Sequence, residues 1–230
     1  MKKRIVLFLA MILSLVLSAV GLTIGAAADG DVATNTRTGT SYTSLADAIS
    51  AASSGDTIDV IADTTVSSPI VITKQVELTS SNGSTVSCSV SNAFTVGVKS
   101  GTSGNLTVSG NLNITSTTVQ AIQMARGVFT LKDSASISAT FDTVNAGGGG
   151  TPNDVTINLQ GGTVTCTAGS DSKGVLFCST EGAVINLSGS TVTTSVSGAS
   201  AIRLNGKNAM LNMTEGTMSA PTKTVALLNN

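Results

Sequence analysis

Apolar and polar residues alternate in short segments along most of the chain, as in Ile157–Leu159 and Ile185–Leu187. Such alternation predicts strands with one apolar and one polar face. With one apolar position of each segment aligned, the segments recur at steps of 28, 23, 28, 28 and 26 residues, at Leu78, Leu106, Phe129, Ile157, Ile185 and Leu211. A repeat of about 20 to 30 residues with this pattern is typical of a solenoid.

Two further apolar positions follow in each repeat, which predicts three strands per unit. The second position lies seven or eight residues after the first, at Val86, Ile114, Ile137, Val164, Val192 and Met218. The third lies fifteen to nineteen residues after the first, at Phe94, Ile122, Val144, Leu176, Ile202 and Ala226 or its neighbours. Turns are expected between the first two strands, at Gly161–Gly162, Gly189–Ser190 and Glu215–Gly216.

These three in-phase positions predict an all-β fold, a right-handed parallel β-helix with three strands per rung. About six rungs and a partial first turn would occupy residues 58–230. The right hand is expected because crossover connections between parallel strands of one sheet almost always take it. A β-sandwich is the competing fold, but its strands would not repeat as in-phase triplets.

One amphipathic helix is predicted ahead of the repeats, within a lead-in segment at residues 29–57. Residues Tyr42–Ala52 carry a single apolar stripe made by Leu45, Ala48, Ile49 and Ala52. Thr43 or Ser44 can cap its start, and Gly55–Asp56 ends it. We expect this helix to cover the end of the solenoid core and the unpaired backbone edge of the first strand.

The segment from Tyr42 to Ile58 resembles the N-terminal cap of right-handed parallel β-helix proteins, the pectate-lyase-like superfold. The similarity is carried by the amphipathic helix and the Gly55–Ile58 sequence Gly-Asp-Thr-Ile that follows it. The superfold includes enzymes, phage tailspikes and bacterial surface adhesins. The resemblance therefore implies the fold and an adhesin-like bacterial secreted or cell-surface protein, whereas activity has to be argued from the site.

The first 28 residues have the features of a signal peptide. Lys2, Lys3 and Arg4 precede an apolar stretch, and Ala26–Ala28 supplies small residues for cleavage before Asp29. An uncleaved membrane anchor is the alternative, but the apolar stretch is short for a bilayer span. We therefore expect a secreted or cell-surface protein with no membrane span after cleavage.

Composition argues against nucleic-acid binding. Three of the 12 basic residues lie in the signal segment, which leaves nine against 13 acidic residues and a net charge of −4. Charged residues make up only 11% of the chain, so Ser, Thr, Asn and Gly supply most of the polar surface.

The sequence offers little support for catalysis. There is no histidine, which removes the commonest general base at neutral pH. Enzymes of the pectate-lyase-like superfold use clustered carboxylates with Ca²⁺, or closely set Asp residues, so a polysaccharide lyase or glycoside hydrolase is the alternative function that the resemblance implies. Here six acidic residues of the repeats are scattered singly, at Asp133, Asp142, Asp154, Asp171, Glu181 and Glu215. The outward cations Lys132 and Arg203 have no acidic partner in register, and we assign no catalytic residue, metal or cofactor.

Four residues are candidates for surface contacts with a partner. Asn158, Asn186 and Asn212 alternate with inward apolar residues, so they should form an outer ladder on stacked rungs about 4.8 Å apart. Phe177 has outward parity, and the alternative is its burial under a loop. Ser and Thr flank the second apolar position and suggest an ice-binding array, although the array is irregular. The expected function is an exported, non-catalytic structural or adhesive module whose partner is an extracellular glycan or protein.

The remaining expectations concern the cysteines and the last rung. Cys88, Cys166 and Cys178 share the inward parity of their strands, which favours small core residues over a disulfide framework. Residues 225–230 read as the last strand, and no capping helix is recognised after it. An uncapped edge would template further pairing, so truncation from a longer protein and end-to-end self-association both remain open.

Overall fold

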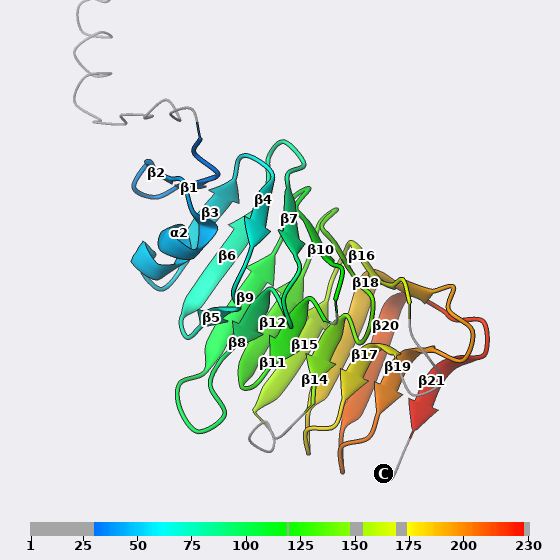
Figure 1. Cartoon of the computed structure of the whole chain (residues 1–230). Helices are drawn as coiled ribbons and strands as arrows, with labels where there is room; N and C mark the ends of the chain where they lie inside the picture. The colour runs from blue at the N-terminus through cyan, green and yellow to red at the C-terminus, as the bar shows by residue number, and fades with distance from the viewer. Residues whose placement is uncertain (1–29, 119, 148–153, 169–173, 228–230) are drawn as a thin grey trace, which may run out of the picture.

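The structure, a computed structural model, describes residues 30–118, 120–147, 154–168 and 174–227. The proposed signal peptide and Asp171 lie outside the described residues. The chain forms an all-β parallel solenoid of about six turns, as predicted, and Figure 1 shows the strands stacked from the N-terminal hairpin to β21. Within the described residues, no helix is both long and apolar enough to cross a membrane.

The strands build three faces. The first contains β3 (Asp56–Val60), β6 (Gln75–Thr79), β9 (Gly104–Val108), β12 (Gly127–Leu131), β15 (Val155–Leu159) and the first halves of β18 (Val184–Thr194) and β20 (Met210–Ser219). The second contains β4 (Thr64–Val66), β7 (Thr85–Cys88), β10 (Asn113–Ser116), β13 (Ser136–Ala139), β16 (Thr163–Cys166) and the second halves of β18 and β20. The third contains β5 (Ile70–Ile72), β8 (Phe94–Val96), β11 (Ile122–Met124), β14 (Val144–Ala146), β17 (Gly174–Cys178), β19 (Ser200–Leu204) and β21 (Lys223–Leu227).

Strand register confirms the predicted apolar columns, with one correction. The second column is aligned from Val86 to Met218, and the third runs from Phe94 to Ile202 and on to Val225. In the first column the prediction for Leu78 was wrong. Val76 pairs with Leu106, and Leu78 pairs with Val108. Both members of each pair point inward, so spacing alone did not show which of them was equivalent.

Two of the predicted turns are instead bends within long strands. The Gly161–Gly162 turn separates β15 from β16, but Gly189 lies inside β18 and Gly216 inside β20. Bulges between Leu187 and Thr191 carry β18 around the corner without ending its pairing with β20. A Cβ on Gly189 would lie 2.3 Å from the Gln160 carbonyl oxygen, so only glycine allows this close approach of rungs.

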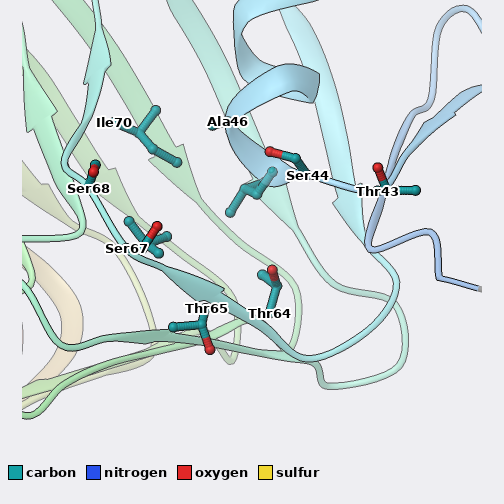
Figure 2. Close-up of a pocket in the computed structure, with 10 residues that line it drawn as sticks. Thr43, Ser44, Ala46, Thr64, Thr65, Ser67, Ser68 and Ile70 are labelled. Carbon is teal, nitrogen blue, oxygen red and sulfur yellow. The ribbon is translucent and has the colours of Figure 1, made fainter.

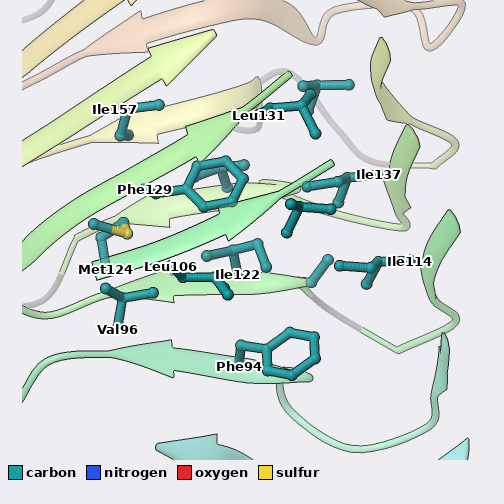
Figure 3. Packing of buried hydrophobic residues seen from close by; sticks show 14 of the residues in the cluster. Phe94, Val96, Leu106, Ile114, Ile122, Met124, Phe129, Leu131, Ile137 and Ile157 are labelled. Carbon is teal, nitrogen blue, oxygen red and sulfur yellow. The ribbon is translucent and has the colours of Figure 1, made fainter. Parts of the chain in front are cut away.

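The interior is packed with the inward apolar columns. Phe94 and Phe129 are among the largest fully buried side chains, and Figure 3 shows them among Ile122 and neighbouring aliphatic residues between the strands. The three cysteines are buried and free, as their inward parity predicted. Burial raises the pKa of the Cys166 and Cys178 thiols, so both are poor nucleophiles in the folded protein.

The N-terminal end is covered by a hairpin and a helix. The helix α2 spans Leu45–Ala51, starts at the cap residue Ser44, and buries its apolar stripe. The lead-in differs from the prediction, because β1 (Ala33–Asn35) and β2 (Thr40–Tyr42) form an antiparallel hairpin within it. Strand β1 also pairs with β3, so this strand, and not the helix, satisfies the backbone edge of the first face.

An ion pair connects the hairpin to the first rung. The Asp56 carboxylate accepts hydrogen bonds from the Asn35 amide at 2.7 Å and from the Arg37 guanidinium at 2.5 Å and 3.0 Å. It also accepts one from the Ser53 backbone N–H at 2.9 Å. Bonding to Arg37 and Asn35 holds the pKa of Asp56 well below its usual range.

At the opposite end, the apolar side chains of β20 and β21 are exposed. Met213 is 46% and Leu227 is 64% exposed, in contrast to the equivalent residues of earlier rungs, which are buried. Residues 228–230 lie outside the described residues. The predicted self-association through this edge stays a prediction.

We expect the Asp56 network to make stability depend on pH. Because the folded-state pKa of Asp56 is depressed, its contribution is complete above the unfolded Asp value of about 3.9 and is lost as the pH falls below it. Asp56→Asn should lower the urea midpoint near pH 7 and reduce the fall in stability between about pH 4 and pH 2. The exposed Asp47 supplies the control variant Asp47→Asn. Equal pH profiles for both variants would contradict the assignment.

Truncation of a core aromatic residue should cost far more than truncation of an outward one. Phe129→Ala is expected to lower the free energy of unfolding by about 3–5 kcal/mol, because Phe129 is fully buried. Phe177→Ala should cost about 1 kcal/mol, because Phe177 is half-buried and points outward. Urea unfolding followed by circular dichroism measures both. Comparable losses would show that Phe177 belongs to the core.

Candidate functional site

The three predicted asparagines form a hydrogen-bonded ladder on the outer side of the first face. Asn212 donates from Nδ2 to Oδ1 of Asn186 at 3.0 Å, and Asn186 donates to Asn158 at 2.8 Å. Asn158 in turn donates to the Thr130 hydroxyl at 3.5 Å. Each amide is therefore held in one orientation by its neighbour, which gives a rigid polar stripe.

Phe177 lies on the outer side of the third face and is partly covered. It pairs in register with Asn145 on β14 and Arg203 on β19. The Arg203 guanidinium carbon lies 5.4 Å from the ring centroid, within the range of a cation–π contact. Phe177 is half-buried, so part of its ring is occupied by a contact within the chain.

The outer side of the second face carries two columns of short polar side chains, which we call the hydroxyl face. The column members are in register from rung to rung. One column contains Thr85, Asn113, Ser136, Thr163, Thr191 and Thr217, and the other contains Thr65, Ser87, Thr115, Ser138, Thr165, Thr193 and Ser219. Twelve of these thirteen residues are Ser or Thr and none is charged. The register thus confirms the columns, and Asn113 and the serines interrupt the threonine array at the positions expected from the sequence.

Several of the described carboxylates are paired with cations of the chain. Within the described residues, no group of three acidic or cysteine side chains is placed to hold a metal ion. Asp154 contacts Arg126 at 2.8 Å, and Glu77 contacts Lys132 at 3.0 Å. Glu77 is not in register with Lys132, but it lies on the adjacent outer column and its side chain reaches Lys132 across the intervening rung, a contact that the sequence analysis did not predict. Its hydrogen bond raises the pKa of Lys132.

A pocket on the third face was not predicted from the sequence. It has a volume of about 510 Å³ and is lined by Val71, Thr95, Gly97, Val98, Lys99, Gln123, Ala125 and Gly147. It forms because the connection after β11 has only two residues, Ala125 and Arg126, whereas the connections after β8 and β14 are much longer. The repeat between Leu106 and Phe129 is only 23 residues long, and this shorter step is the sequence feature that corresponds to the short connection.

Arg126 ties the two longer connections together beside the pocket. Its guanidinium donates to the Gly101 carbonyl oxygen at 2.9 Å, in the connection after β8. The same group pairs with Asp154, the residue before β15. Gly97 begins the first connection at φ +73°, and a Cβ there would lie 2.0 Å from the Arg126 carbonyl oxygen. Gly97 and Arg126 together fix the wall of the pocket.

A smaller hollow lies at the N-terminal end, between α2 and the β4–β5 turn. Its volume is about 190 Å³, and Figure 2 shows hydroxyl side chains such as Ser44, Thr64 and Thr65 around it. The residues that line it include no charged group. We assign no ligand to this hollow.

Comparison with protein-family models, curated proteins and solved structures finds no match for the chain. The parallel β-solenoid is thus established by the strand register alone. The finer similarity to pectate-lyase-like proteins stays a prediction.

The asparagine ladder should add measurable stability. Asn186→Ala removes one donated and one accepted hydrogen bond, which should cost about 1–2 kcal/mol of unfolding free energy. Asn212→Ala removes only the donated bond and should cost about 0.5–1 kcal/mol. Urea unfolding of the two variants measures the difference. Equal losses would indicate that the ladder bonds are replaced by water without cost.

Proposed function

We propose that the chain is an exported, non-catalytic module that adheres to an extracellular glycan through its hydroxyl face. The observation that carries the proposal is the pair of in-register polar columns on the second face, without a charged residue in either column. Export is supported by Lys2–Arg4, the following apolar stretch and the small residues before Asp29.

The chemistry of this face suits a polymer with repeated hydrogen-bonding groups. Each Ser or Thr hydroxyl can donate and accept, and stacked strands repeat the group about every 4.8 Å. Short side chains lose little conformational entropy when they bind, in contrast to Lys or Arg. Individual contacts of this kind are weak, so affinity would come from many of them along one linear chain of sugars.

A glycan array probed with the chain after signal cleavage tests the proposal. Thr165→Lys places a long cation at the centre of the hydroxyl face and should weaken binding at least about tenfold. Thr156→Lys, on the outer side of the first face, is the matched control and should leave binding unchanged. A matrix-protein array run in parallel identifies a protein partner instead. Equal losses in both variants, or no glycan bound, would overturn the proposal.

An activity assay distinguishes the proposed adhesive function from the alternative function, a polysaccharide lyase or glycoside hydrolase. The same protein is incubated with polygalacturonate and other uronates, with and without Ca²⁺. We expect no turnover, because no Asp or Glu is among the residues that line the two pockets described above. Saturable release of unsaturated or reducing products would show that the chain is an enzyme.

A further inference from the structure

The rung formed by β20 and β21 has an open edge, with no further strand beside it among the described residues. Six large apolar side chains are exposed in the described part of the chain, and four of them lie in this rung: Met210, Met213, Val225 and Leu227. Their counterparts Leu187 and Leu204, one rung earlier, are buried. An open edge with exposed apolar side chains favours pairing with another chain. We infer that a second copy of this chain covers the rung, in a symmetric dimer whose two open rungs face each other.

The opposite end of the solenoid explains why this contact is symmetric. There β1 already pairs with the outer edge of β3, and α2 buries its apolar stripe. The first face therefore offers no free edge at that end to β20 of another copy. A contact between unlike ends, which would build a filament, is thus disfavoured. A two-fold contact between two open rungs closes after two copies, and it makes the facing strands antiparallel.

The two charges of the open rung determine which strands face each other. Glu215 ends the first-face half of β20, Lys223 begins β21, and residues 210–227 contain no other charge. Neither residue forms an ion pair with a described residue of its own chain. When β20 lies antiparallel to β21 of the second copy, with Met213 opposite Val225, Glu215 lies opposite Lys223. The two-fold axis forms this pair twice, and such complementarity fixes the register of an interface.

The other symmetric pairings lack this complementarity. If β21 faced β21 of the second copy, the two corners that carry Glu215 would also meet, and like charges would repel. If β21 faced the second-face half of β20, with Val225 opposite Met218, Lys223 would lie opposite Ala220 and have no acidic partner. The charges therefore favour the first-face half of β20 as the partner of β21.

This arrangement has a consequence for the hydroxyl face. When the first and third faces exchange partners, the second-face half of β20 lies beside the same half of the second copy. The two hydroxyl faces then lie on one side of the dimer and form a longer array. A longer array would raise the avidity for a polymer, a consequence that rests on the proposed function, whereas the dimer itself does not.

Sedimentation equilibrium of the chain after signal cleavage measures the association. We expect a monomer–dimer equilibrium without larger species. Met213→Asp should weaken the dimer at least about tenfold, because it places a charge in the apolar contact. Val71→Asp is the matched control, because Val71 is an equally exposed apolar residue on β5, away from the open rung, and it should leave the dimer unchanged. Circular dichroism checks that both variants are folded.

A charge reversal tests the register without altering an apolar residue. Glu215→Lys and Lys223→Glu should each weaken the dimer several-fold, because like charges then face each other, and the double variant should restore it. A chain that stays monomeric at high concentration, as it would if a different protein covered this rung, overturns the inference. Species larger than a dimer, or a double variant no tighter than the single ones, also overturn it. None of these outcomes bears on the glycan array, because one monomer carries a complete hydroxyl face.

Discussion

The in-register stacking of parallel strands is the constraint on which every other feature of this molecule depends. Each residue lies above its equivalent in the previous rung, about 4.8 Å away. Inside, this aligns columns such as the one through Phe94, Ile122 and Val144. Outside, the same rule aligns amides and hydroxyls, whose bonds then connect rungs, as between Asn186 and Asn158. Core packing and the polar outer faces are thus two results of one register.

This constraint explains why much of the fold was predictable from the sequence. Inward positions are mostly apolar in every rung, with exceptions such as Ser116 and Thr194. The second and third columns could therefore be read without coordinates. The asparagine ladder followed from the same alternation. Register was ambiguous in the first column, because two inward residues flank one polar residue there and the repeat length varies. There the longer connection before Leu106 allowed either Val76 or Leu78 as its equivalent, and backbone pairing chose Val76.

Features at the corners and ends were less predictable, because they depend on local backbone geometry instead of periodicity. Gly189 suggested a turn, yet β18 bends there and stays paired. The β1–β2 hairpin has too short a pattern to stand out, although Asn35 and Arg37 carry the contacts to Asp56. Similarly, Lys132 reaches Glu77 across a rung because long side chains extend beyond their own column.

The pocket illustrates how a regular scaffold produces a distinct site. Stacking fixes the strands but leaves the connections free in length, because an insertion at a corner does not shift the register of the rungs beside it. A short connection at Ala125–Arg126 between two longer ones therefore leaves a hollow without disturbing the core. From this position the Arg126 side chain contacts Gly101 in one of the longer connections and Asp154 in the other. In a solenoid, unequal repeat length is thus a sequence signal for sites, as equal repeat length is for the fold.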